Sequence, residues 1–210
     1  TIYKAIAVCP VCGSPTDAEA IKLQFRKKAK KQRLIAVVLK NRKGKGKSYR
    51  IANDKDLEVA KEAETYLEKR QTELSKRWGI DPVPDEIIST PTGREYAPGN
   101  PLFNFTPVSL YGMTRWRDLF NPRQRLALVV ITEAIRTTFE LMKAQGIVSE
   151  NAKIITTYLA LILDGIADHD SELCTWRPAT LDVGHTFGRQ ALSMTWDYAC
   201  LLYTSPSPRD

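Results

Sequence analysis

The residues best suited to chemistry are two cysteines on one predicted turn, in the sequence Cys9-Pro-Val-Cys12-Gly13. Two thiolates at this spacing can bind one zinc ion, and the glycine allows backbone N–H groups to point at the sulfurs. A redox-active pair would instead be expected at the start of a helix, where the helix dipole lowers a thiol pKa. Because Ser14-Pro15 and a further predicted strand follow, the sequence favours zinc, with a redox pair and two inert thiols as the alternatives.

A structural zinc ion needs four ligands, and this turn supplies only Cys9 and Cys12. The sequence has no second Cys-x-x-Cys, and Cys174 stands alone. We therefore expect the other two ligands to lie outside residues 1–210. One pair and one single cysteine before residue 200 do not make a disulfide framework, which favours a reducing compartment and predicts a cytoplasmic protein.

The sequence Asp168-His169-Asp170 could bind a metal or supply a general base. The only other histidine is His185, its spacing from His169 is not typical of a ligand pair, and no cluster of carboxylates accompanies it. We interpret His169 as a cation at the C-terminal end of a predicted helix, where the helix dipole favours it. The sequence contains no Gly-x-Ser-x-Gly elbow, phosphate-binding loop or dinucleotide-binding glycine motif.

Positive charge is concentrated in the first 50 residues. The net charge of the chain is +7, but residues 1–50 contain fourteen Lys and Arg residues against only Asp17 and Glu19. Such clusters neutralise phosphates by releasing counter-ions, so nucleic acid is the expected partner and an anionic membrane surface ranks second. The alternative is a solvated, highly charged β surface. The residues expected to contact DNA phosphates are Lys27, Lys28, Lys30, Lys31, Lys43, Lys45 and Lys47.

A second group combines arginines with aromatic residues. Arg115 and Arg117 flank Trp116, and two more arginines follow in the first turn of a predicted helix. Because the helix dipole disfavours cations at that end, this placement indicates an anion nearby, and Arg115 and Arg117 are candidate DNA contacts. The alternative is that these are ordinary surface arginines, with Trp116 and Phe120 in the core.

Short β-rich or apolar stretches predict strands that would position the cysteines and lysines. These stretches are residues 2–8, 21–25, 34–39 and 48–51. We interpret residues 1–52 as a small antiparallel, zinc-ribbon-like β module. Asn53 or Asp54 can cap a helix that begins at Lys55 and stops at Gly79, so residues 53–79 form a helical arm with only a thin apolar stripe.

A mainly helical region is predicted to follow a proline-rich loop at residues 80–110. Within residues 111–199, Thr114 can cap a short helix, Asn121-Pro122 can begin a long one, and Ser149 can cap a third. The two long helices are expected to form an antiparallel pair that makes the main core, and a last helix is predicted over residues 186–199. The predicted fold class is α+β.

Six segments, taken together and in order, resemble the large bacterial and archaeal adenine-specific DNA methylases that contain an internal zinc ribbon. The most specific are Tyr111-Gly-Met113 and Phe187-Gly-Arg-Gln-Ala-Leu192. The sequence departs from that family at His185 and Ser193, where Asn and Pro are expected. The six segments are Cys9–Gly13, Leu34–Leu39, Tyr111–Gln124, Tyr158–Leu161, Leu173–Trp176 and His185–Tyr198.

The resemblance implies methyl transfer from S-adenosylmethionine to the exocyclic amine of adenine, with the base flipped out of the duplex. It also implies that the cofactor loop and the first zinc-binding pair precede this region, and that the catalytic Asp-Pro-Pro-Tyr sequence follows Ala199. The chain would be an inserted part of an α/β methyltransferase, with DNA and the rest of the parent chain as partners and no catalytic residue of its own. The alternative is a non-catalytic zinc-ribbon module that binds nucleic acid or docks partner proteins.

Residues 200–210 change character abruptly and resemble a translated sequencing adapter, so we expect no function from them. Together with a start at Thr1 inside a predicted strand, this indicates a fragment cut at both ends. The longest apolar runs, Leu126–Ile131 and Tyr158–Leu163, are far shorter than the about 18 residues that a membrane span needs.

Overall fold

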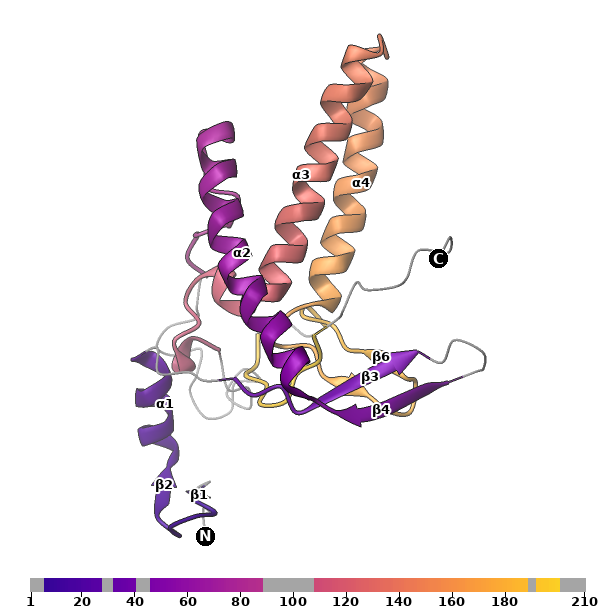
Figure 1. Ribbon diagram of the computed structural model, residues 1–210. Coiled ribbons are helices and arrows are strands. Elements are labelled where there is room, and N and C mark those ends of the chain that lie inside the picture. Colours follow the sequence, from indigo (N-terminus) through magenta and orange to yellow (C-terminus); the bar gives the residue numbers. More distant parts are fainter. Residues whose placement is uncertain (1–5, 28–31, 41–45, 89–107, 189–191, 201–210) are drawn as a thin grey trace.

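Figure 1 shows a computed structural model of the chain, which describes residues 6–27, 32–40, 46–88, 108–188 and 192–200. Within these residues there are four α-helices and three two-stranded antiparallel sheets, which confirms the predicted mixture of helices and strands. Three long helices rise side by side from a lower layer of hairpins and loops (Figure 1). None of the described helices is long and apolar enough to cross a membrane.

The N-terminal unit is a β-hairpin that leads into a short helix. Strand β1 (Ile6–Val8) pairs with β2 (Pro15–Asp17), and the Asp17 carboxylate accepts a hydrogen bond of 2.8 Å from the Ala20 amide to begin α1 (Ala18–Arg26). The strand predicted over residues 21–25 is therefore wrong. Apolar residues alternate there, but the aspartate cap and the helix-favouring residues around it outweigh that short pattern.

A second hairpin consists of β3 (Ala36–Lys40) and β4 (Lys47–Ile51). It forms a sheet separate from β1 and β2, with α1 between the two in sequence, so the described part of residues 1–52 does not form the single β module that the sequence predicts. The strand predicted over residues 48–51 is confirmed. Tyr49 anchors this hairpin to the body because its hydroxyl accepts a 3.3 Å hydrogen bond from the Trp176 indole.

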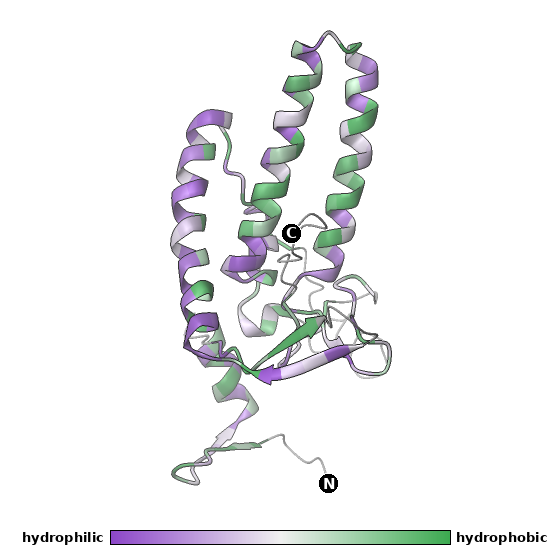
Figure 2. Cartoon of the chain, turned by 45° about the vertical axis from the view of Figure 1, so that its right-hand side comes forward, coloured by the Kyte–Doolittle hydropathy of each residue, from purple (hydrophilic) through white to green (hydrophobic). Residues whose placement is uncertain are grey.

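Helix α2 (Asp54–Trp78) begins one residue before the predicted start and ends before Gly79 as predicted. Its first turn is closed by a capping box in which the Asn53 side chain and the Asp56 side chain each bond the other's backbone N–H, and Gly79 follows its last residue. Only Ala63, Leu67 and Leu74 are buried along it, which agrees with the thin apolar stripe. Most of its surface is hydrophilic (Figure 2), because charged residues occupy the faces turned to solvent.

Helices α3 (Pro122–Ala144) and α4 (Ser149–His169) are packed against each other as an antiparallel pair. The predicted start of α3 is confirmed, because the Asn121 side chain accepts a 3.0 Å hydrogen bond from the Gln124 amide. The predicted serine cap of α4 is wrong: Val148 occupies the cap position and makes no side-chain bond. The proline-rich loop lies largely in residues 89–107, outside the described residues.

Among the described residues only three buried apolar side chains, Val129, Met142 and Ala152, lie on α3 and α4, so this pair does not make the main core that the sequence predicts. One cluster joins α2 to α3, and the other lies below the helices among loops. On α4, the apolar residues Ile155, Tyr158 and Ile162 are exposed, and Figure 2 shows hydrophobic residues along both helices. The first cluster contains Leu67, Leu74, Val83 and Val129, and the second contains Ile88, Val108, Met113, Leu119 and Leu173.

Two short 3-10 helices, η3 (Val108–Tyr111) and η4 (Trp116–Leu119), line the second cluster. Arg115 rather than Thr114 occupies the cap position of η4.

After α4 the chain makes a small hairpin of β5 (Trp176–Arg177) and β6 (Asp182–Val183).

The helix predicted over residues 186–199 is wrong, since residues 186–188 and 192–199 contain no helix. Leu192 and Met194 instead pack individually on the second cluster, and tertiary packing here overrides the local pattern. The backbone of this stretch also bonds distant segments: the Val108 amide donates to the Leu192 carbonyl at 3.1 Å, and the Ala199 amide to the Cys174 carbonyl at 2.6 Å.

Candidate metal-binding and DNA-binding sites

The predicted zinc-binding turn is the tip of the β1–β2 hairpin. The last strand pair is Val8 with Pro15, and the chain then closes through a 3.0 Å bond from the Cys9 amide to the Ser14 carbonyl. The Gly13 amide donates to the Cys9 carbonyl at 2.9 Å, and Gly13 has φ +72°, a left-handed conformation that favours glycine. The motif therefore forms a compact turn at the lower end of the molecule (Figure 1).

Both thiols of this turn are accessible, because Cys12 is exposed and Cys9 is partly exposed. The Cys12 sulfur lies 3.2 Å from the Ser14 hydroxyl oxygen. Hydrogen bonds from the Ser14 side chain and backbone, and then from Cys9, lower the pKa of the Cys12 thiol to about 7. A thiolate is the form that binds zinc, so this environment suits a metal ligand.

The structure places two of the predicted DNA-binding lysines. Lys27 is exposed directly after the last residue of α1. Lys47 begins β4, and its ammonium group lies 4.7 Å from the centroid of the Trp176 ring. The other five, Lys28, Lys30, Lys31, Lys43 and Lys45, lie outside the described residues.

The two arginines predicted to contact DNA share one carboxylate. Nη1 of Arg115 lies 2.9 Å from one oxygen of Asp85, and Nε of Arg117 lies 2.9 Å from the other. Trp116, between them, is about one-third exposed and lies against Phe187, with ring centroids 6.2 Å apart. Asp85 therefore offsets part of the positive charge that this segment could offer to a phosphate.

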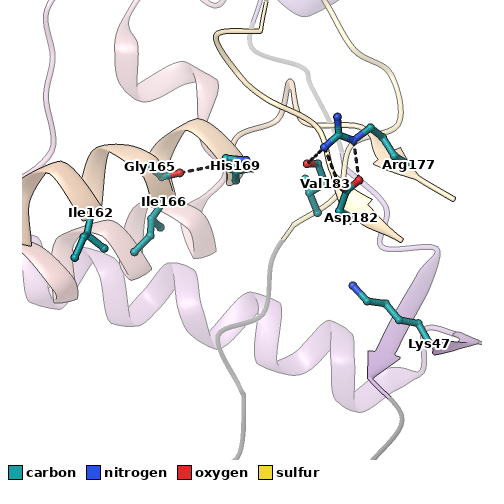
Figure 3. Close-up of a pocket in the computed structure, with 8 residues that line it drawn as sticks. All are labelled: Lys47, Ile162, Gly165, Ile166, His169, Arg177, Asp182 and Val183. Carbon is teal, nitrogen blue, oxygen red and sulfur yellow. Dashed lines mark hydrogen bonds and ion pairs between the residues drawn. The ribbon is translucent and has the colours of Figure 1, made fainter. Parts of the chain in front are cut away.

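Near the lower end of α4 there is an open hollow of about 430 Å³ (Figure 3). Ile162 and Ile166 line one side, and Lys47 extends toward it from β4. The Arg177 guanidinium on the other side is held by Asp182, with Nε 2.7 Å from a carboxylate oxygen. Because Asp182 neutralises that arginine, the hollow has only a weak positive character.

Beside this hollow, the structure brings together three side chains that were not grouped from the sequence. Nδ1 of His185 lies 2.7 Å from a carboxylate oxygen of Asp168, and the rings of His169 and His185 have centroids 4.2 Å apart. His169 itself bonds the Gly165 carbonyl at 2.9 Å. His169 ends α4 as expected. The helix predicted over residues 186–199 is wrong, and with that helix in place the sequence gives no reason to expect His185 close to His169. A hairpin predicted at β5 and β6 would have indicated that the chain turns back toward the end of α4.

The pKa of the Asp168 carboxyl is set by opposing influences. Partial burial raises it, whereas the hydrogen bonds from His185 and from the Phe187 amide lower it, and the net effect is a pKa below the ordinary value. Among the described residues, Asp168, His169 and His185 are the only group of three or more His, Cys, Asp or Glu residues placed to hold one metal ion. The two-thiol turn offers only two such groups, Cys9 and Cys12.

Two of the six segments that carry the family resemblance, residues 111–124 and the described part of 185–198, meet at a buried polar centre beside Asp170 and Glu172. Gln124, at the start of α3, is buried and donates a 3.3 Å hydrogen bond to Asp170. The Asn121 amide group donates to the Tyr198 hydroxyl at 3.1 Å, and the Glu172 backbone amide donates to the Leu119 carbonyl at 2.8 Å. These polar residues hold the ends of α3 and α4 and the C-terminal stretch together.

No protein-family model matches the chain, and comparisons with curated proteins and with solved structures also gave no match. The functional interpretation therefore depends on the residues themselves. They define two places where chemistry can occur: the two-thiol turn at the hairpin tip, and the hollow beside Lys47, which His169 lines together with the adjoining cluster of His185 and Asp168.

Proposed function

We propose that this chain is the zinc-binding, DNA-contacting part of an adenine-specific DNA methyltransferase. In this role Cys9 and Cys12 supply two of four zinc ligands, and lysines near the hairpins neutralise DNA phosphates. Methyl transfer from S-adenosylmethionine would depend on motifs outside residues 1–210. The observation that carries the proposal is the accessible two-thiol turn at the hairpin tip, closed by Gly13 in the left-handed conformation.

The turn suits zinc for a chemical reason. With a pKa of about 7, Cys12 is about half thiolate at neutral pH, so little free energy is needed to deprotonate it when a metal binds. The hydrogen bond between the Cys9 amide and the Ser14 carbonyl fixes the hairpin around the thiols before any metal arrives. A preformed turn of this kind loses little conformational entropy on binding.

The DNA-contacting role is supported by where the charge lies. Lys27 is exposed at the end of α1, and three of the next four residues in sequence are also lysines. Lys47 follows the Lys-Gly-Lys-Gly sequence between β3 and β4. Lysines in such stretches can each contact a phosphate without reading base sequence, so they would hold DNA while another part of the enzyme selects the adenine.

The methyltransferase part of the proposal rests on the family resemblance. The two segments that contain its most specific sequences, residues 111–124 and the described part of 185–198, pack against each other and against residues 170–176. These residues have structural tasks, such as the buried Gln124 that closes the cap of α3. Their shared packing supports a common scaffold and assigns them no catalytic step.

The decisive experiment is to recover the full-length gene from the source DNA and to assay its product. We expect the encoded protein to continue past Ala199 into an Asp-Pro-Pro-Tyr sequence and to transfer methyl groups to adenine in DNA. The double variant Cys9→Ser/Cys12→Ser should contain one zinc ion fewer per chain and bind DNA more weakly, whereas the matched variant Cys174→Ser should keep the zinc content of its parent. A full-length protein without that tetrapeptide and without methyl transfer would refute the proposal.

A second candidate function is a non-catalytic module that docks a partner protein. One observation favours it: Ile155, Tyr158 and Ile162 leave an apolar face of α4 largely exposed. Contiguous exposed apolar residues of this kind often mark protein interaction sites. In the full-length gene product, zinc binding and partner capture without any methyl transfer would favour this candidate over the enzyme.

A further inference from the structure

We propose that Asp168, His169 and His185 form a binding site for one divalent transition-metal ion, such as Zn²⁺, at the C-terminal end of α4. This site is independent of the two-thiol turn, because it contains no cysteine and belongs to a different element of the fold. It is also independent of the proposed methyltransferase role. Three observations carry the inference: the spacing of the ligand atoms, the rigidity of the backbone that holds them, and the local charge.

The ligand atoms have nearly the spacing that a metal requires. One ligand atom from each of the three residues lies within 4.8 Å of the others. The Asp168 oxygen Oδ2 is 2.7 Å from Nδ1 of His185 and 4.0 Å from Nδ1 of His169. Ligands bound at about 2.1 Å around a tetrahedral ion lie roughly 3.4 Å apart, so the observed distances bracket the required one. Binding through Nδ1 of His169 would replace the 2.9 Å hydrogen bond that this atom makes to the Gly165 carbonyl, and small rotations of the two exposed rings would complete the fit.

The backbone beneath these side chains is held by several hydrogen bonds. The Thr186 amide and hydroxyl donate to the Asp168 carbonyl at 2.6 and 2.8 Å, and the Phe187 amide donates to the Asp168 carboxylate at 2.9 Å. These bonds fix residues 186–187 against the end of α4. A metal site held by such a frame needs little rearrangement before it binds.

Gly188 keeps space for the His185 side chain. A Cβ atom added to Gly188 would lie 3.2 Å from the Cβ of His185, which is closer than ordinary van der Waals contact. A side chain at this position would therefore require His185 to shift by a few tenths of an ångström. The absence of a side chain at Gly188 allows the ring to stay in the cluster.

The charge and chemistry of the site favour a transition metal. Two imidazoles and one carboxylate suit zinc, nickel, cobalt or copper better than magnesium or calcium, which prefer oxygen ligands. The negative end of the α4 dipole and the ionised Asp168 both attract a cation. The side chains of His169 and His185 are 40% and 43% exposed, so an ion can reach them from solvent and a water can complete its coordination.

The test uses the whole chain carrying Cys9→Ser/Cys12→Ser, which removes the thiol site, and an affinity tag without histidine. Zn²⁺ is titrated calorimetrically, and the two histidine ring signals are followed by NMR; the chain has only two histidines, so both can be assigned. We expect one Zn²⁺ per chain and movement of both ring signals. His185→Asn and His169→Gln should each weaken binding at least about tenfold, which is the lower end of the loss seen even when an outer partner of a metal ligand is removed.

Glu150→Gln, an exposed carboxylate at the other end of α4, is the matched control and should bind Zn²⁺ unchanged. Circular dichroism confirms that each variant is folded. The proposal is overturned if the thiol-free protein does not bind Zn²⁺, if binding leaves both ring signals in place, or if folded His185→Asn binds as tightly as its parent.

Discussion

Gly112 packs directly against the backbone of Phe25, at the point where α1 meets the loop region below the long helices. A Cβ atom added to Gly112 would lie 3.0 Å from the Phe25 carbonyl oxygen, and Gly112 has φ +80°. The Arg26 guanidinium strengthens the same junction, since its Nε donates a 3.1 Å hydrogen bond to the Leu110 carbonyl. The glycine of the Tyr-Gly-Met sequence is thus explained by packing between α1 and η3.

This relationship predicts that Gly112→Ala destabilises the fold. The new methyl group meets backbone atoms that cannot move aside easily, and alanine is strained at positive φ, so we expect a loss of about 1–3 kcal/mol in the free energy of unfolding. Chemical denaturation measures this loss. The control is Gly165→Ala, because Gly165 is helical and an added Cβ there meets nothing within 4 Å. If both variants are equally stable, the close approach at Gly112 is not as described.

The pair formed by Arg50 and Asp56 predicts a pH dependence of stability. Hydrogen bonds from the Arg50 guanidinium, and then from the Asn53 amide, lower the pKa of the Asp56 carboxyl to about 2. A carboxyl with a lower pKa in the folded state stabilises the fold above its unfolded pKa of about 3.9, and this contribution disappears as the pH falls toward 2.

Asp56→Asn should therefore flatten the pH dependence of the unfolding free energy between about pH 4 and pH 2. The matched variant Asp54→Asn changes the first residue of the same helix and should leave most of that dependence in place. Thermal unfolding followed across this pH range tests the difference. Identical slopes for wild type and Asp56→Asn would contradict the ion pair.

The Cys12 environment predicts fast alkylation at neutral pH. With a pKa of about 7, Cys12 reacts as a thiolate, and Ser14→Ala removes the hydrogen bond that contributes most to this lowering. We expect iodoacetamide to modify Cys12 several-fold more slowly in Ser14→Ala at pH 7, as read by mass spectrometry. Cys174 is fully buried and should stay unmodified in the folded chain. An unchanged rate in Ser14→Ala would show that Ser14 does not tune the thiol.

The capping residues explain which parts of the fold could be predicted from sequence. Asn53, Gly79 and Asn121-Pro122 act locally, so α2 and the start of α3 can be predicted from the sequence. Asp17 is an equally local signal, but the alternation of Ile21, Leu23 and Phe25 concealed the helix that it begins.

The candidate sites likewise differ in how far the sequence predicts them. The turn of Cys9 and Cys12 is set by a short local motif and could be predicted, whereas the histidine cluster could not. His185 reaches Asp168 only because the chain reverses at β5 and β6 and because Thr186 bonds the end of α4. Such contacts depend on tertiary packing. The hydrophobic periodicity of residues 186–199 indicates only local secondary structure and does not predict these contacts.

The proposal assigns methyl transfer to motifs outside residues 1–210, so it predicts that residues 1–210 alone do not methylate DNA. The sequence contains neither a glycine-rich cofactor loop nor an Asp-Pro-Pro-Tyr sequence. Incubation with radiolabelled S-adenosylmethionine and adenine-containing duplex DNA should leave the DNA unlabelled, while a known adenine methyltransferase serves as the positive control. Labelled DNA that depends on the purified chain would overturn the assignment of the chemistry to motifs outside it.

The lysines near the hairpins predict DNA binding that weakens steeply with salt. Each phosphate contact releases counter-ions, so the plot of log K against log salt concentration has a negative slope. Its steepness should decrease by about 0.9 for every contact removed. A quadruple glutamine variant at Lys27, Lys28, Lys30 and Lys31 should reduce that slope. The matched control makes the same change at exposed lysines of α2, which are Lys55, Lys61, Lys69 and Lys76.

Fluorescence anisotropy with a short labelled duplex measures both variants at several salt concentrations. The two variants carry the same net charge, so a general electrostatic attraction would reduce the slope equally in both. A specific phosphate-binding surface near α1 instead reduces it mainly in the first variant. Equal slopes in the two variants, or an affinity that does not depend on salt, would count against DNA contacts by these lysines.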